Sequence, residues 1–197
     1  AIFSAITGTT DEAPTFVTSA TMGTEALTFY AVFAEKTPGT QTTVTDVLTS
    51  AITGVTGTGS YSDWSDKTVT SDAVYAGNSA KSSIDAIQMR SNNSNSGIIS
   101  TTSGGILKSV TVTWTDGNTS GRSLDIYGSN TAYSKATDLY DSKKQGTKLG
   151  SITYGTSTSL TISGDYTYVG LRSNNGALSI YKYSIWFFFN ENLLYSH

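Results

Sequence analysis

Apolar and polar residues alternate through most of the chain after residue 60, in short runs separated by clusters of Ser, Thr, Asn and Gly. The clearest run is 107–114, Leu-Lys-Ser-Val-Thr-Val-Thr-Trp, which is rich in β-branched residues. Alternation with a period of two is typical of strands with one buried face, and the polar clusters are typical of turns. Roughly eight such strands, almost without helical periodicity, predict an all-β fold: a jelly-roll-type antiparallel β-sandwich.

Two further expectations concern local connections. Residues 148–154 and 159–163 are alternating runs on either side of Gly155-Thr-Ser, which predicts that they pair as a hairpin. Residues 44–52 are expected to begin the domain as a short helical turn, capped by Thr45 or Asp46.

A short phrase occurs twice, in residues 87–98 and 169–178. Each copy has an alternating apolar run, then Arg-Ser-Asn-Asn, then a Gly and further apolar residues. This pattern predicts the same strand–turn–strand arrangement in two places, with Arg90 and Arg172 at equivalent positions. Two interpretations stay open. Each Arg holds its own turn by donating to carbonyls, or the paired Arg and Asn side chains reach one end of the domain and bind a polar ligand.

Composition divides the chain into four parts. Residues 1–36 contain β-prone runs and predict a small partial β unit, which we expect to be the end of a repeat that begins upstream, because two or three strands alone are marginally stable. Residues 37–43, with Pro38-Gly39, are expected to be a linker. Residues 44–189 carry the sandwich, and 190–197 form an atypical tail.

The chain starts at Ala1 without a basic and then apolar segment, so we expect it to be an excerpt of a longer protein.

The most apolar run is 185–189, Ile-Trp-Phe-Phe-Phe, which is too short to span a bilayer, so no membrane insertion is expected. An exposed run of this kind is an aggregation hazard. We therefore expect it to be covered, and self-association through this C-terminal apolar strand is one way to cover it.

The charge and the cysteine content of the chain exclude several classes of function. Charged residues make up 14% of the chain and the net charge is −3, which gives no electrostatic footprint for nucleic acid. The absence of Cys removes thiol catalysis, disulfides and Cys-based zinc sites. A surface rich in Ser, Thr, Asn and Gly favours an extracellular, cell-surface or virion-surface location.

No enzyme is expected. His197 is the only His and the last residue, where it is poorly placed for a catalytic triad or metal cluster. The few Asp pairs lie in Ser/Thr/Gly turns, which turn capping explains better than a pair of glycosidase carboxylates. Without Cys and with a single His, the chain offers mainly oxygen atoms as metal ligands, and these suit a hard ion such as a structural calcium. The candidate ligands are Asp63, Asp66 and Asp116.

Aromatic side chains near the repeated phrases are stronger candidates for function. Sugars have apolar faces that stack on aromatic rings, while Arg and Asn bond the hydroxyls. The predicted ligand-binding residues are Trp64, Arg90, Asn92, Asn93, Arg172, Asn174 and Asn175. The alternative is that Trp64 fills the core and the Asn residues permit tight turns.

The order of these motifs carries a family resemblance over about residues 44–186. The aromatic loop, Arg-Ser-Asn-Asn, Val-Thr-Val-Thr-Trp and Leu-Asp-Ile-Tyr-Gly resemble the galactose-binding-like sandwich domains, of discoidin and carbohydrate-binding-module type, in secreted proteins of gut Bacteroidales. Tyr30-Ala-Val-Phe-Ala resembles the closing strand of Listeria–Bacteroides type β-grasp repeats, which act as stalks.

The resemblance implies a non-catalytic module of a secreted or surface bacterial protein, which binds a glycan or surface polymer with loops at one end of the sandwich. Such modules often carry a structural calcium ion. The alternative function is a structural domain of a fibre, decoration or adhesin, from a bacterium or a phage, that acts by self-assembly.

Overall fold

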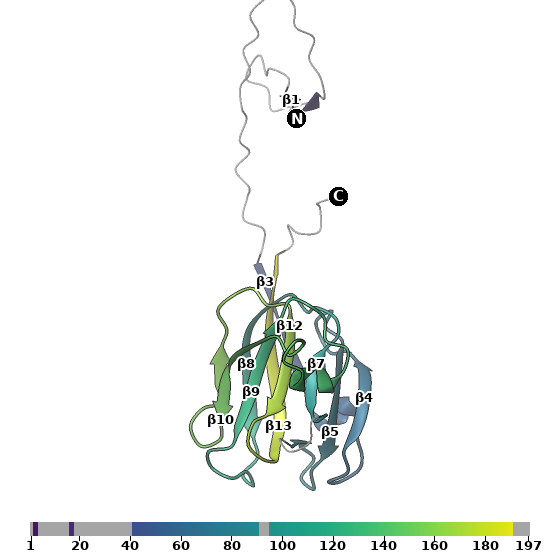
Figure 1. Ribbon diagram of the computed structural model, residues 1–197, viewed down its shortest axis with the longest axis vertical. Helices are drawn as coiled ribbons and strands as arrows, with labels where there is room; N and C mark the ends of the chain where they lie inside the picture. The colour runs from purple at the N-terminus through teal and green to yellow at the C-terminus, as the bar shows by residue number, and fades with distance from the viewer. Residues whose placement is uncertain (1, 4–15, 18–40, 91–94, 191–197) are drawn as a thin grey trace, which may run out of the picture. The chain divides into compact units, whose positions relative to one another are not determined.

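The computed structural model describes residues 2–3, 16–17, 41–90 and 95–190 (Figure 1). The chain divides into two compact units, Ala1–Pro38 and Gly39–His197. In the first unit, β1 (Ile2–Phe3) pairs antiparallel with β2 (Phe16–Val17). The named strands of the second unit also pair antiparallel, which confirms the predicted all-β sandwich fold.

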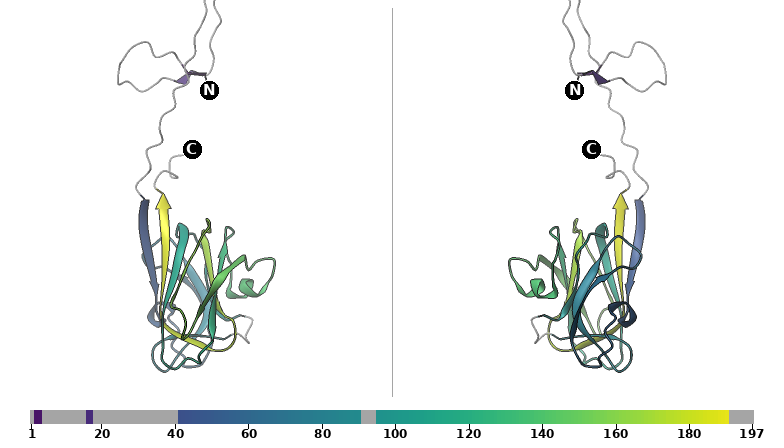
Figure 2. Two further views of the ribbon diagram at one scale, coloured as in Figure 1. Left: turned by 90° about the vertical axis from the view of Figure 1, so that its left-hand side faces the viewer. Right: turned by 90° about the vertical axis from the view of Figure 1, so that its right-hand side faces the viewer.

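Two sheets face each other in the second unit (Figures 1 and 2). The six-strand sheet has the order β10-β9-β12-β7-β5-β4. Its strands are β4 (Ser62–Lys67), β5 (Tyr75–Lys81), β7 (Gly97–Ser100), β9 (Ser123–Ser129), β10 (Thr147–Thr153) and β12 (Tyr168–Ser173). In the five-strand sheet, β13 is the central strand. One of its edges pairs with β8, which in turn pairs with β11. Its other edge pairs first with β6, over residues 178–180, and then with β3, over residues 183–190. Its strands are β3 (Gln41–Leu48), β6 (Ile87–Met89), β8 (Ile106–Trp114), β11 (Ser159–Thr161) and β13 (Leu178–Asn190). The end of β5 pairs with β6 and joins the two sheets.

The main core lies between the sheets and follows from the alternation in the sequence. On β8 the buried side chains include Val110 and Val112, and on β12 they include Val169 and Leu171. Each buried pair is separated by one residue on the opposite face of its strand, as the period of a strand requires.

A second, smaller core covers the outer face of the six-strand sheet. The loop 130–146 folds back over this face and contains a short 3₁₀ helix, η1 (Ala136–Tyr140). Leu139 of η1 is fully buried and packs with Ile99, Tyr127 and Tyr133. A Cβ at Gly170 would overlap the Leu139 side chain, so only glycine lets the helix approach the sheet this closely.

The prediction of a helical turn over 44–52 is wrong for most of its length. Residues up to Leu48 belong to β3, and only the four-residue helix α1 (Ser50–Thr53) follows, with Thr49 at its N-cap. Asp46 does not cap a helix. Its buried carboxylate accepts hydrogen bonds from the Thr70 and Ser71 N–H groups (3.1 and 2.7 Å), the Ser71 hydroxyl (2.5 Å) and the Tyr75 hydroxyl (2.7 Å). β3 also begins at Gln41, inside the range 37–43 expected to be a linker.

The predicted hairpin between 148–154 and 159–163 is also wrong. β10 pairs with β9 in one sheet, whereas β11 pairs with β8 in the other. The turn around Gly155 therefore carries the chain from one sheet to the other instead of folding it back on its own strand.

The apolar run 185–189 forms part of an internal strand. β13 pairs with β8 along one edge and with β6 and then β3 along the other. Phe187 is fully buried, while Trp186 lies on the outer face and is 46% exposed. The run is thus covered on both edges by its own chain. Asn190, the first residue of the predicted tail 190–197, ends β13, and residues 191–197 lie outside the described residues, as does most of the partial β unit predicted over 1–36.

Candidate functional site

The two Arg-Ser-Asn-Asn phrases connect the sheets at the same end of the sandwich. The first leads from β6 to β7, and the second leads from β12 to β13. Strand β6 pairs with β13 and β7 pairs with β12, with Met89 opposite Leu178 and Ile98 opposite Leu171. The end of each first strand therefore lies beside the start of a strand from the other copy. The side chains that follow nevertheless point to different surroundings.

Arg172 holds the loop over the outer face of the six-strand sheet. Its Nη1 donates to the Leu139 carbonyl of η1 at 2.6 Å. Its guanidinium lies 4.8 Å from the ring centroid of Tyr140 and 5.0 Å from that of Tyr127. A guanidinium between two aromatic rings is stabilised by cation–π attraction. Arg172 therefore fastens η1 rather than its own turn.

Arg90 has a separate environment. Its guanidinium stacks 4.3 Å from the ring centroid of Tyr61, and its backbone N–H donates to the Ser96 hydroxyl at 2.9 Å, across its own turn. Burial raises the pKa of Tyr61 above its ordinary value, although the neighbouring Arg90 acts in the opposite direction. The two arginines are not brought together as one binding pair.

The second turn is tied to a neighbouring loop. The side-chain oxygen of Asn175 accepts the Ser123 N–H at 2.9 Å, and its amide donates to the Gly121 carbonyl at 3.2 Å. The Asn174 N–H donates to the Ser123 carbonyl at 2.9 Å, while the Asn174 side chain is exposed. Asn92 and Asn93, the equivalent pair in the first copy, lie outside the described residues.

Trp64 of β4 is 8% exposed and belongs to the main core. Its indole N–H donates to the Ser79 hydroxyl at 3.0 Å. The ring lies against Gly77 on the neighbouring strand, where a Cβ would come within 2.7 Å of the indole. The absence of a side chain at Gly77 therefore makes room for this Trp at the edge of the sandwich.

The three carboxylates predicted as metal ligands do not converge. Asp63 on β4 accepts from the Asn78 amide at 2.8 Å, and Asp66, with φ of 58°, accepts from the Ser65 hydroxyl at 2.6 Å. Asp116 is exposed in the turn after β8. In the part of the chain that the structure describes, no group of three or more His, Cys, Asp or Glu side chains is arranged to hold a metal ion.

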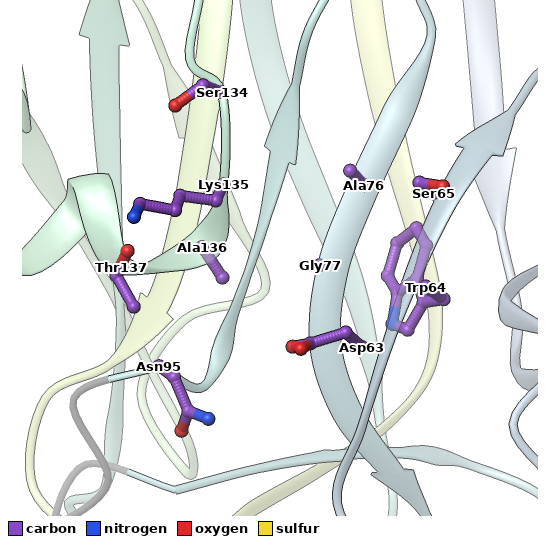
Figure 3. A pocket seen from close by; sticks show the side chains of 10 residues that line it. All are labelled: Asp63, Trp64, Ser65, Ala76, Gly77, Asn95, Ser134, Lys135, Ala136 and Thr137. Carbon is purple, nitrogen blue, oxygen red and sulfur yellow. The ribbon is translucent and has the colours of Figure 1, made fainter.

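A pocket of about 390 Å³ opens on the outer face of the six-strand sheet, between β4–β5 and the loop that carries η1 (Figure 3). The Asp63 carboxylate extends across β5 toward the side where Asn95 lies. The polar side chains that line the pocket are Asp63, Ser65, Asn95, Ser134, Lys135 and Thr137, and Trp64 and Ala76 contribute to its apolar wall. Of the residues predicted from the sequence, the pocket contains Asp63 and Trp64. Sequence reasoning did not select Asn95 or Lys135.

Two side-chain oxygens at or near the pocket are buried without a hydrogen-bond partner among the described residues. One belongs to Asn95, which lines the pocket, and the other to Asn78, which follows Gly77 on β5 and donates its amide to Asp63 at 2.8 Å. Buried acceptors without a partner cost free energy. The lining itself combines the Asp63 carboxylate, the Lys135 ammonium, the Asn95 amide and hydroxyls.

Asp138 fixes the loop side of the pocket. Its carboxylate accepts from the Ser134 N–H at 2.7 Å, the Ser134 hydroxyl at 2.8 Å and the Lys135 N–H at 3.1 Å. Burial acts to raise the pKa of Asp138, but these hydrogen bonds and the Lys144 ammonium at 3.7 Å lower the pKa below its ordinary value. The ionised carboxylate therefore positions the backbone of the two residues that line the pocket.

Comparisons with protein-family models, with curated proteins and with solved structures give no match for this chain. The structure describes no helix that is long and apolar enough to cross a membrane. The resemblance to galactose-binding-like domains therefore stays an expectation from sequence motifs, and the case for a function depends on the pocket itself.

Proposed function

We propose that the second unit is a non-catalytic binding module whose pocket between β4–β5 and η1 takes a neutral sugar residue of a glycan. The observation that carries the proposal is the mixed polar lining of the pocket, which combines one carboxylate, one ammonium group, an amide and hydroxyls. Sugar hydroxyls both donate and accept. They can donate to Asp63 and accept from Lys135, which a purely acidic or purely basic ligand cannot do.

The lining also favours binding over hydrolysis. Glycoside hydrolysis uses two carboxyl groups on either side of the scissile bond. Asp63 is the one carboxylate among the described residues that line the pocket. The module is therefore proposed to hold its ligand without cleaving it, and an extracellular, cell-surface or virion-surface location belongs to the same proposal.

A glycan-array screen with the full chain tests this function, followed by calorimetry with the best ligand. Asp63→Ala and Lys135→Ala should each weaken binding by about 10-fold or more, because a hydrogen bond to a charged group contributes about 1.5–3 kcal/mol. Asp72→Ala and Lys182→Ala are matched controls, since both side chains are exposed and lie outside the pocket lining. Failure to bind any glycan, or equal losses in the control variants, would refute the proposal.

A further inference from the structure

Among the described residues, four strands form the open edges of the two sheets: β4 and β10 in the six-strand sheet, and β3 and β11 in the five-strand sheet. An edge strand exposes unpaired backbone N–H and C=O groups, which pair readily with another strand. Natural sheets prevent this with charged side chains, bulges or very short edge strands.

Three of the edges carry such protection. Strand β4 exposes Asp63 and Asp66, and its register shifts between Trp64 and Lys67. Strand β10 carries the exposed Lys148 and a shift before Gly150, and β11 is only three residues long.

Strand β3 lacks these features. It spans eight residues, Gln41–Leu48, and pairs with β13 in unbroken register. No described residue forms a backbone hydrogen bond with its other edge. Its one charged residue, Asp46, is fully buried and turned inward to the donors of Thr70, Ser71 and Tyr75. Strand β3 lies beside β13 at the edge of the sheet (Figure 2), and the residues it presents there are neutral, mainly Thr and Val.

We infer that β3 pairs antiparallel with β3 of a second copy of this chain, across a two-fold axis, so that the two five-strand sheets become one. A neutral strand is complementary to itself in this arrangement, because no like charges come together across the axis. Val47 is 37% exposed on β3, and Trp186 is 46% exposed and lies opposite Thr45 on β13, next to the junction. Pairing removes part of this apolar surface from water.

This contact is independent of the pocket, which lies on the outer face of the other sheet. It also differs from self-association through the C-terminal strand. Both edges of β13 are already occupied within the chain, so the edge open to a second copy is that of β3.

Sedimentation velocity of the full chain over a range of micromolar concentrations tests the inference. We expect the mass to double from the 20.8 kDa of one chain as the concentration rises. Val47→Lys should return it to one chain, because a charged side chain on an edge strand disfavours its pairing with another strand. Thr113→Glu, on the exposed outer face of the internal strand β8 and opposite Lys182, should leave the dimer intact.

Near-UV circular dichroism separates a lost contact from a lost fold. Val47→Lys and Val47→Glu should each be monomeric and keep the near-UV circular dichroism of the original chain. A chain that stays monomeric at every concentration overturns the inference. So does an assembly that both Val47 variants retain, since the contact then lies elsewhere, including in residues 1–38.

Discussion

The buried carboxylate of Asp46 offers the sharpest test of how this sandwich is held closed. Its two oxygens accept from the Thr70 and Ser71 N–H groups and from the Ser71 and Tyr75 hydroxyls. These donors lie on the segment before β5 and on β5 itself, whereas Asp46 lies on β3 of the other sheet. Tyr75→Phe removes one of these bonds, and Asp46→Ala removes all of them.

The two changes should differ in size. Tyr75→Phe keeps the ring and removes one hydroxyl bound to a charged group, so we expect a loss of about 1.5–3 kcal/mol in the free energy of unfolding. Asp46→Ala leaves the buried Tyr75 hydroxyl and the other donors without their acceptor, so we expect about 3–5 kcal/mol, the size typical of breaking a buried polar network. In a domain of this size these losses lower Tm by roughly 2–4 °C for each kcal/mol.

Urea unfolding followed by tryptophan fluorescence measures both losses, and the double variant completes the cycle. Because the two side chains share one hydrogen bond, the loss in the double variant should fall below the sum of the single losses by about 0.5–3 kcal/mol. Ser142→Ala, at an exposed turn position, is the control and should change stability by less than about 0.5 kcal/mol. Additive losses, or a harmless Asp46→Ala, would refute the view that this carboxylate joins the sheets.

Three further predictions follow from contacts described above. Gly77→Ala places a Cβ in overlap with the Gly97 carbonyl oxygen and 2.7 Å from the Trp64 ring, and should cost about 1–3 kcal/mol with a shift in Trp fluorescence, while an unchanged spectrum and stability would contradict this packing. The pKa of Asp138 is lowered in the folded chain, so the unfolded chain takes up the proton first; stability should be complete above about pH 4 and should fall as the pH drops further. Urea titrations at pH 6 and pH 3 should show this loss, and in Asp138→Asn the loss should shrink. Arg172→Gln should release η1 and speed amide exchange in residues 136–140, whereas exchange in β8 should not change.

The alternation in the sequence predicts several of the strands but not their partners. Residues 107–114 form β8 as predicted, because a half-buried strand places a residue of the same kind at every second position. The hairpin prediction fails because β10 and β11 have the right local pattern but join different sheets. The pattern shows which face of a strand is buried and does not show which strand lies beside it.

The helix prediction fails for a different reason. An Asp at an inward position of a strand interrupts the apolar alternation and makes residues 44–48 look less like a strand. Asp46 is tolerated there only because Tyr75, Ser71 and Thr70 supply donors from more than twenty residues away. No local signal contains that information.

The pocket could be predicted in part. Trp64, predicted to bind ligand, lines the pocket, and so does Asp63, which the sequence predicts as a metal ligand instead. Lys135 comes from a loop whose position over the sheet depends on Gly170 and on Arg172, both remote in sequence. The Ser, Lys and Thr residues of this loop suggest only a turn when the sequence is considered alone. They line a pocket only once the loop is packed on the sheet.

The pairing of the first and last strands of the sandwich has a mechanical consequence. Gln41 lies opposite Asn190, so the chain reaches the domain and leaves it at the same end, on neighbouring strands. Tension between the segments before Gln41 and after Asn190 therefore pulls across the β3–β13 ladder and loads its hydrogen bonds one after another rather than all together. The domain should open at low force from this corner, with β3 peeling away first and the six-strand sheet, which bears the pocket, left intact until later.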